Sequence, residues 1–293
     1  YLFSGVPVSE YTSIGCHTCL WDYNNNDYHH WVYAENIDKI LPPIVSTDTI
    51  FNKEISGKAL NIGTGIHDSS AALLPYALSS TKPFLLISTG TWSISLNPFS
   101  GQILTKDDLE NDCLHYMRTD GKPVRSSRLL LGSEYSLQVE KLATHFNRNK
   151  DYHKEVAFDE NIFQNHLTTG GHFFHFECIH LPRPQPLKNS YDTFRNFEEG
   201  YHALMIELVE LQVESAKRAI GNSAIELIYI DGGFVGNEIY IRILTHHFPQ
   251  YAIYSTRAPL GSALGAAMII SEKTTDDNFL KEYYDLHQHV IDF

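Results

Sequence analysis

The sequence predicts an α/β protein with a central sheet, and two stretches support this prediction. In the last hundred residues a strand is expected over 225–230, followed by Asp231-Gly232-Gly233, a helix over 237–248, a strand over 251–254 and a small-residue helix over 261–270. Earlier in the chain, two short apolar stretches flank a glycine turn. Strands that alternate with helices and glycine turns are typical of a sheet covered by helices.

The clearest helical pattern lies at 197–220. Leu204, Leu208 and Leu211 recur at a spacing that places them on one face of a helix. Gly221 follows where a helix would end, because glycine readily adopts the conformation of a C-terminal cap. The pattern therefore predicts one long helix with a defined end.

The middle of the chain predicts a hairpin. Residues 84–88 and 92–96 read as two strands joined by the turn Thr89-Gly90-Thr91. The next segment, 98–128, is expected to be rich in loops, and 129–146 has helical spacing.

A separate unit is expected before residue 84. A short buried strand over 59–62 leads through Gly63-Thr64-Gly65 into a helix over 68–78, and the polar linker 79–83 ends in proline. The linker is the predicted domain boundary. The expected parts are 1–80, 84–272 and a helical tail at 273–293.

Composition limits the classes of partner. The chain has 293 residues and a net charge of −13, from 35 acidic and 22 basic residues. Such a charge repels nucleic acid and anionic membranes, although a backbone-lined pocket can still bind an anion such as ATP. Four cysteines are too few for a disulfide scaffold of this size and favour a reducing, cytoplasmic location.

The segment from Gly63 to Ala72 carries the first candidate residue. Asp68 follows a glycine loop and begins the expected helix, so its carboxylate can face a cleft and accept a proton. Asp before Ser69 and Ser70 is equally an ordinary helix cap, and on this segment alone the cap is the more frequent explanation.

Two further turns are candidates for a phosphate or nucleotide site. Ser88-Thr89-Gly90-Thr91 offers hydroxyl groups and a glycine that lets backbone amides approach a phosphate. Asp231-Gly232-Gly233 follows an apolar strand, and Asn237 could contact a purine edge. A plain hairpin turn and a plain strand-to-helix turn remain the competing interpretations.

Metal and redox signals are weak. Cys16-His17-Thr18-Cys19 contains a C-x-x-C pair, but no second pair follows at zinc-finger spacing. Sixteen histidines are scattered without a recognised ligand spacing. The three tryptophans, Trp21, Trp31 and Trp92, could stack on a sugar, but core packing is the expected role of each.

In this order and together, the motifs resemble those of the FGGY carbohydrate kinases, which have an actin-like ATPase (ribonuclease H-like) fold. The resemblance extends over about residues 11–272. It implies that 1–80 is the end of a sugar-binding domain and that 84–272 is a nucleotide-binding domain. His67-Asp68 with Ala71-Ala72 is similar to the family's segment that carries the base. Residues 88–93, whose Gly-Thr-Trp-Ser form is nearest to rhamnulokinases, are similar to its second phosphate loop. Asp231-Gly232-Gly233 with Asn237 is similar to its adenosine motif, and 263–267 to the helix that closes the second domain.

The resemblance implies an ATP-dependent kinase for a ketose of the L-rhamnulose or L-fuculose type, with ATP and Mg²⁺ as cofactors. It implies that Asp68 is the general base and that His67 and Ser69 bind the sugar. It assigns ATP binding to Thr89, Gly90, Thr91, Gly232, Gly233 and Asn237, and assigns no residue to a metal. The expected partner is a small sugar in the cytoplasm, without nucleic acid or membrane. A homodimer is a further expectation from relatives that no feature of the sequence specifies.

Three alternatives stay open. They are a xylulokinase or other FGGY polyol kinase, a non-catalytic actin-like ATP-binding protein or sugar sensor, and a zinc or redox protein built on Cys16 and Cys19. The family's first phosphate loop, of the Asp-x-Gly-Thr type, is not found. The chain is therefore expected to begin partway through the first domain and not to phosphorylate a sugar by itself.

Overall fold

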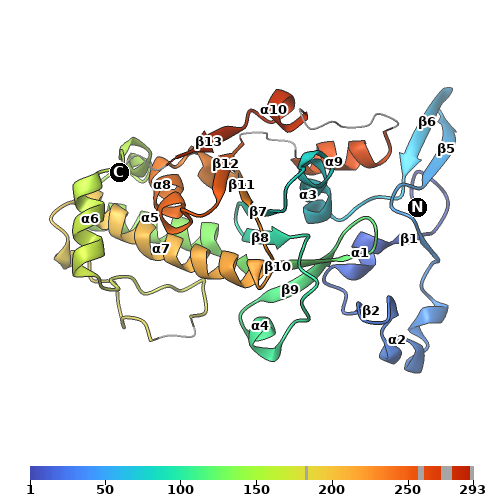
Figure 1. The fold of residues 1–293 in the computed structure, drawn as a ribbon, viewed down its shortest axis with the longest axis horizontal. Coiled ribbons are helices and arrows are strands. Elements are labelled where there is room, and N and C mark those ends of the chain that lie inside the picture. The colour runs from blue at the N-terminus through green and yellow to red at the C-terminus, as the bar shows by residue number, and fades with distance from the viewer. Residues whose placement is uncertain (182–183, 257–260, 272–278, 291–293) are drawn as a thin grey trace.

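The computed structural model describes residues 1–181, 184–256, 261–271 and 279–290. A seven-stranded sheet has the order β13-β12-β11-β7-β8-β10-β9 (Figure 1). Neighbouring strands β7, β11 and β12 are parallel, and the remaining pairs are antiparallel. The predicted α/β class is confirmed, with a mixed sheet. The strands are β7 (Phe84–Thr89), β8 (Ser93–Asn97), β9 (Cys113–Met117), β10 (Pro123–Leu129), β11 (Leu227–Gly232), β12 (Ala252–Ser255) and β13 (His287–His289).

The expected hairpin is formed by β7 and β8, with Leu86 opposite Leu96 and Thr89 opposite Ser93. On its other side β7 runs parallel to β11, with Gly232 opposite Thr89. Because parallel strands end at the same edge of a sheet, the topology brings the Thr89–Thr91 turn next to the Asp231–Gly233 turn.

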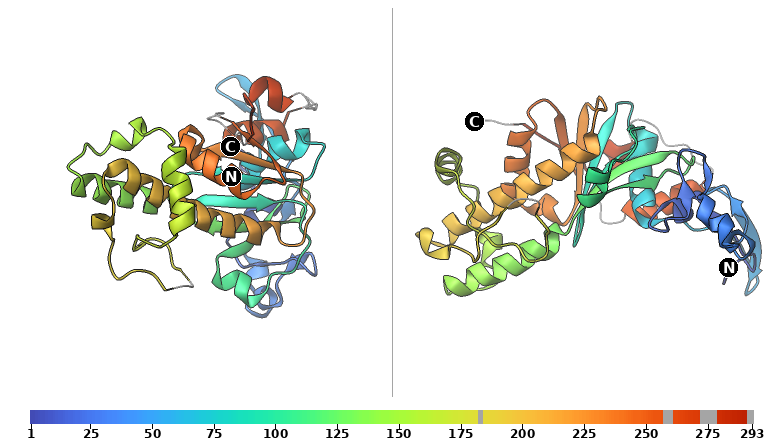
Figure 2. Two further views of the ribbon diagram at one scale, coloured as in Figure 1. Left: turned by 60° about the vertical axis from the view of Figure 1, so that its left-hand side comes forward. Right: turned by 90° about the horizontal axis from the view of Figure 1, so that it is seen from below.

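Helices cover both faces of the sheet (Figure 2). Side chains of β7 alternate between two cores, as the period of a strand requires. Leu85 and Ile87 belong to the larger core, and Phe84 and Leu86 to the smaller one. The helices that contribute to the larger core are α5 (Leu131–His145), α6 (Glu160–Thr169), α7 (Phe197–Ile220) and α8 (Glu238–His247).

Helix α7 has the bounds that the apolar spacing predicts. The Asn196 side chain accepts a hydrogen bond from the Glu199 amide, so the first turn is capped. Gly221 ends the helix with a φ of 55°, a conformation that most other residues avoid. Local sequence signals therefore fix both ends of this helix.

On the smaller core lie α3 (Asp68–Ser79), α9 (Gly261–Ile269) and α10 (Phe279–Tyr283). A Cβ at Gly265 would lie 1.8 Å from the carbonyl oxygen of Ala71, so α9 contacts the backbone of α3 directly. Leu73 and Tyr76 of α3 also pack against the sheet. The helix before the 79–83 linker thus shares the core of the strands after it, and the division at residue 80 remains a proposal.

The first 63 residues form short elements beside β9 and α3 (Figure 1). Helix α1 lies close to β9, because a Cβ at Gly15 would be 2.6 Å from Met117. Three two-stranded ladders complete this part. Its elements are β1 (Ser9–Glu10), α1 (Tyr11–Gly15), β2 (Trp21–Asp22), β3 (Asp27–Tyr28), α2 (His30–Ala34), β4 (Ile44–Val45), β5 (Ile50–Ile55) and β6 (Lys58–Gly63).

Three expectations about elements are wrong. The strand expected at 59–62 is real but is largely exposed, because β6 pairs only with β5 around Ser56-Gly57. Both turn residues have positive φ, which is the signature of a tight hairpin. The segment 98–128 is not mainly loop, since it contains α4 (Lys106–Glu110), β9 and β10. The tail includes α10 but also β13, which pairs with β12 at the sheet edge.

Candidate active site

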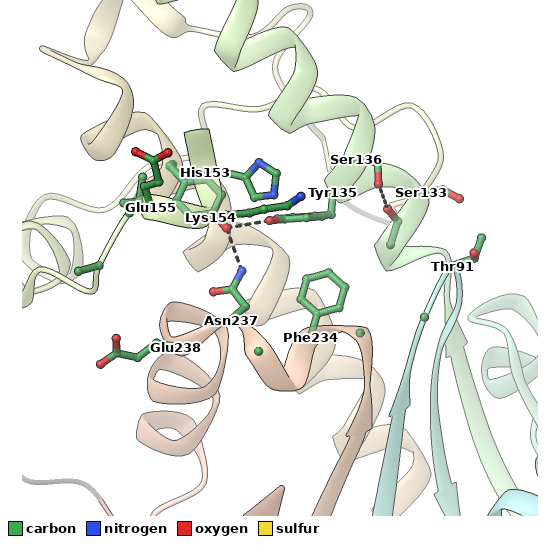
Figure 3. A pocket seen from close by; sticks show the side chains of 17 residues that line it. Thr91, Ser133, Tyr135, Ser136, His153, Lys154, Glu155, Phe234, Asn237 and Glu238 are labelled. Atoms are coloured by element: carbon green, nitrogen blue, oxygen red, sulfur yellow. Dashed lines mark hydrogen bonds between the residues drawn. The ribbon is translucent and has the colours of Figure 1, made fainter. Parts of the chain in front are cut away.

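A cavity of about 980 Å³ opens where the ends of β7 and β11 meet the beginnings of α5 and α8 (Figure 3). Four of the residues expected to bind ATP line it, although they come from segments far apart in the sequence. Its volume lies at the upper end of the range found for small-molecule sites. The lining residues used below are Gly90, Thr91, Gly132, Ser133, Tyr135, His153, Gly233, Phe234 and Asn237.

The turn at Gly90 is fixed by close backbone contacts. The Gly90 amide donates to the Trp92 carbonyl at 2.9 Å, and the Gly132 amide donates to the Thr91 carbonyl at 3.1 Å. A Cβ at position 132 would lie 2.0 Å from the Gly90 carbonyl oxygen. Only glycine therefore lets α5 begin directly against this turn, which leaves the Thr91 and Ser133 hydroxyls at the pocket (Figure 3).

Thr89 and Gly232 lie behind the pocket rather than in its lining. The Thr89 hydroxyl, which is buried, donates to the Asp231 carbonyl and accepts from the Phe234 amide at 3.0 Å. Gly232 has a φ of 88°, and a Cβ there would be 1.8 Å from the Thr89 carbonyl oxygen. Both residues join the two turns, and neither is among the residues that line the pocket.

Asp231 is buried at the end of β11. Burial raises the pKa of its carboxyl to about 6, against the opposing effect of nearby Ser88 and Tyr76 hydroxyls. The Tyr76 hydroxyl donates to it at 3.3 Å. The carboxyl thus ties α3 to the centre of the sheet, and its side chain is not among those that line the pocket.

Asn237 lines the pocket, but its amide already has protein partners. The side-chain oxygen caps α8 by accepting from the Tyr240 amide at 3.1 Å. The side-chain nitrogen donates to the Tyr201 hydroxyl at 2.8 Å, and that hydroxyl lies 2.8 Å from the Tyr135 hydroxyl (Figure 3). In this arrangement Asn237 fixes the pocket wall, which differs from the expected contact with a purine edge.

An aromatic wall was not foreseen from the sequence. The Tyr135 ring lies edge-on to Phe234 at 5.0 Å and to His153 at 5.7 Å, measured between ring centroids. Flat aromatic groups suit a nucleobase, because they offer apolar area and ring contacts. The helical spacing of 129–146 placed Tyr135 on a helix, but no local pattern distinguished a pocket side chain from a core one.

Asp68 is the first residue of α3, and its side chain is 81% exposed. Its carboxylate accepts from the Ser69 amide at 2.7 Å and lies 3.4 Å from Nε2 of His67. A carboxylate in the first turn of a helix is favoured by the helix dipole. The N-cap of α3 is His67, so the interpretation of Asp68 as the cap is wrong, and its carboxylate stands in the first turn, open to a ligand.

His67 connects Asp68 to neighbours from other segments. Its ring centroid lies 5.3 Å from those of His17 and Tyr116, and its amide donates to the Thr12 hydroxyl at 2.9 Å. Burial lowers the pKa of His67, so the ring is neutral at neutral pH despite the adjacent carboxylate of Asp68. A neutral His67 leaves the Asp68 carboxylate without a cationic partner at this contact.

The Cys16–Cys19 pair, which suggested a zinc or redox site, does not form a metal-binding cluster among the described residues. Cys16 is buried and Cys19 is exposed, and both are free thiols. No group of three or more His, Cys, Asp or Glu side chains that could hold a metal ion occurs among the described residues. In that same part of the chain, no helix is both long and apolar enough to cross a membrane.

The chain is similar in fold to several solved sugar kinases. A carbohydrate kinase from Novosphingobium aromaticivorans is 22% identical, with a TM-score of 0.65 over 96% of this chain and 66% of that one. A ligand-bound xylulose kinase from Lactobacillus acidophilus is 11% identical, with a TM-score of 0.70 over 99% and 60%. Plasmodium falciparum glycerol kinase with ADP is 14% identical, with a TM-score of 0.61 over 92% and 55%.

This chain thus spans between 55% and 66% of the length of those three kinases. No curated protein matches it significantly in sequence. A family model, the C-terminal domain of FGGY carbohydrate kinases, matches residues 81–278, which is more than half of the chain. The actin-like ATPase fold is confirmed by this match and by the mixed sheet. The chain belongs to the FGGY carbohydrate kinase family.

Proposed function

We propose that the protein transfers the γ-phosphoryl group of ATP to a hydroxyl group of a sugar. The observation that carries this proposal is the shared pocket: Gly90 and Thr91 line it together with Gly233 and Asn237, more than a hundred residues later. A single pocket made by a strand-turn-strand loop and a glycine-rich turn suits a triphosphate at one end and a nucleoside at the other.

In this proposal the aromatic wall holds the base of ATP, and the Gly90–Thr91 turn lies beside its phosphates. Phosphoryl transfer depends mainly on positioning and on charge stabilisation. Backbone donors and the Thr91 and Ser133 hydroxyls contribute to both. A basic side chain is also near, because Lys154 lines the pocket while it pairs with Asp151 at 2.6 Å.

Asp68 is the proposed general base. A base must be ionised and within reach of the hydroxyl whose proton it takes. The exposed carboxylate of Asp68 can be approached by a sugar, and neutral His67 can orient it through the 3.4 Å contact. His67 and Ser69 are the proposed sugar-binding neighbours. The hydroxyl oxygen would attack the γ-phosphorus while Asp68 accepts the proton and ADP leaves.

Mg²⁺ is the proposed companion of ATP. This ion keeps several water ligands and is bound largely through substrate phosphates, so it requires few protein ligands. The ion would neutralise phosphate charge when it is bound with ATP.

For the acceptor, we propose a ketose, with L-rhamnulose and L-fuculose ahead of D-xylulose and glycerol. The support is the Gly-Thr-Trp-Ser form of residues 90–93. A xylulose kinase and a glycerol kinase are among the solved neighbours, so these acceptors belong in the same test.

The test is an ADP-release assay against a panel of these four acceptors, with an ATP-only blank. It is run on this chain and on the longest form of the protein that can be expressed. Sugar-dependent ADP release and a phosphorylated sugar in the product would support the proposal. ATP binding without transfer to any acceptor in either form would favour the non-catalytic ATP-binding or sugar-sensing alternative. Tight stoichiometric zinc in purified protein would favour the metal-protein alternative.

A further inference from the structure

A cluster of side chains between Asp68 and the phosphate turn has no role in the site described so far. The cluster contains His17, which follows α1, Tyr116 of β9 and Arg128 of β10. It lies next to Trp92, the residue before β8. These segments are separated by up to about a hundred residues in sequence. Their convergence beside the proposed base calls for a physical explanation.

Arg128 forms the end of the cluster nearest the phosphate turn. Its guanidinium carbon lies 5.3 Å from the ring centroid of Trp92, which directly follows Thr91. One terminal nitrogen of Arg128 is 2.5 Å from the Asp112 carboxylate, and the Arg128 amide donates to the Asp112 carbonyl at 3.1 Å. Trp92 is 41% exposed rather than packed in the core as expected. Arg128 therefore gives this exposed ring a fixed cationic neighbour.

Tyr116 forms the other end. Only 2% of it is exposed, and its ring centroid lies 4.9 Å from that of His17 and 5.3 Å from that of His67. Burial raises the pKa of its hydroxyl to about 12, against the opposing effect of the Arg128 guanidinium, which interacts with that hydroxyl. Tyr116 thus contacts Arg128 with its hydroxyl and the two histidines with its ring.

Strands β9 and β10 give the two residues a rigid common frame. They pair from Met117 opposite Pro123 to Cys113 opposite Ser127, which sets Tyr116 opposite Val124. Arg128 follows Ser127 on β10 and lies opposite Ile94 of β8. The Ser70 hydroxyl donates to the Met117 carbonyl at 2.9 Å, which attaches the first turn of α3 to the same strand. Sheet positions are held more precisely than loop positions, which suits a supporting role for a reacting group.

We propose that Tyr116 and Arg128 are positioning residues, which hold the His67 ring beside Asp68 in a fixed relation to the turn that contains Thr91. Arg128 is not in the lining of the large pocket, and a direct contact with ATP phosphates is not part of the inference. Only the expected effect on turnover rests on the proposed kinase function. The expected effect on the His67 ring can be measured in this chain whether or not it transfers phosphate.

The first arm of the test measures the His67 ring by nitrogen-15 NMR of this chain. Because Nε2 faces the Asp68 carboxylate at 3.4 Å, the expected neutral form carries its proton on Nε2. Arg128→Met and Tyr116→Leu should shift His67 towards a mixture of both tautomers. Arg128→Lys should restore much of the original signal. An unchanged His67 spectrum in folded Arg128→Met and Tyr116→Leu would overturn the proposal.

The second arm measures turnover in whichever form of the protein transfers phosphate. Arg128→Met is expected to lower kcat ten- to a hundred-fold while KM for ATP changes less than three-fold, and Arg128→Lys should recover part of the loss. Arg148→Met is the matched control, because Arg148 also lies over an aromatic ring, that of Tyr152 at 4.7 Å, away from this cluster. It should leave both parameters unchanged.

The two arms separate two kinds of failure. A His67 shift in a protein that transfers phosphate to no acceptor would contradict the kinase proposal and support the positioning of His67. Normal transfer with a normal KM in Arg128→Met would contradict the positioning role and leave the kinase proposal intact. If Arg128→Met does not fold, Tyr116→Phe, which removes only the hydroxyl that interacts with Arg128, is measured in its place, and Arg128→Lys remains the conservative control.

Discussion

The pocket beside Gly90 and the region of Asp68 are built in different ways. Around the pocket, backbone groups nearly touch: Gly132 lies against Gly90, and Gly232 lies against Thr89. Around Asp68, the carboxylate is exposed, and its neighbour His67 is held by the side chains of His17 and Tyr116. Glycines therefore fix the backbone around the pocket, whereas side-chain contacts fix the region of Asp68.

The largest effect should come from Asp68, the proposed general base. Asp68→Asn keeps the size of the side chain but cannot accept a proton at neutral pH, so transfer should fall about a thousand-fold, within the range for loss of a general base. ATP affinity should stay within about two-fold, since the exposed carboxylate is outside the pocket lining. A sugar phosphorylation assay measures the transfer rate, and an ATP titration measures the affinity. Transfer at the original rate would remove Asp68 from the mechanism.

The next largest effect should come from a pocket glycine. In Gly132→Ala the added Cβ would meet the Gly90 carbonyl oxygen at 2.0 Å, so the turn or α5 must move. ATP affinity should fall at least ten-fold, as measured by calorimetry. Gly101→Ala is the control, because a Cβ there meets no described atom within 4 Å. Equal affinities in the two variants would show that the turn does not contact ATP.

A smaller effect is expected at the aromatic wall. Tyr135→Ala removes the ring that lies 5.0 Å from Phe234 and should weaken ATP binding about three- to ten-fold, the usual range for one aromatic contact. Tyr135→Phe keeps the ring and loses only the hydroxyl contact with Tyr201, so it should bind nearly as well as the original protein. If Tyr135→Phe bound ATP more weakly than Tyr135→Ala, the Tyr135 ring would not be what contacts ATP.

The smallest functional effect is expected at Asp231, where pH should change stability rather than activity. Its folded-state pKa is raised from 3.8 to about 6 by burial, so between these values the folded state binds more protons than the unfolded state. Its contribution to stability is complete below about pH 4 and is lost as the pH rises through 6. Urea unfolding should show a larger loss of stability from pH 4 to pH 7 in the original protein than in Asp231→Asn, by on the order of 2 kcal/mol. If stability fell equally with pH in the original protein and in Asp231→Asn, the pH dependence would come from a group other than Asp231.

Much of the fold follows from local sequence. The ends of α7 were predictable because Asn196 and Gly221 carry capping signals, and the β7–β8 hairpin because a glycine turn separates two apolar strands. Strands β9 and β10 were missed, since sequences such as Arg125-Ser126-Ser127-Arg128 are polar although the first three are buried. Some of their polar groups pair with residues of other segments, for example Arg125 with Asp108, and no local pattern reveals such pairs.

The candidate site was predictable to a similar extent. Glycine turns identified Gly90 and Gly233, because glycine at the end of a strand is a local signal. The supporting residues Tyr135, Tyr116 and Arg128 were not identified, since their positions depend on tertiary contacts. The sequence motif also did not distinguish Thr91, which lines the pocket, from Thr89, whose hydroxyl bridges two strands.

Two turns distant in sequence are proposed to form one nucleotide site. An ATP titration of this chain, followed by NMR of backbone amides, tests this proposal. Saturable binding is expected, with the largest shifts at Gly90, Thr91 and Gly233 and with weaker binding in Gly132→Ala. Absence of saturable binding, or shifts confined to residues outside this pocket, would contradict it.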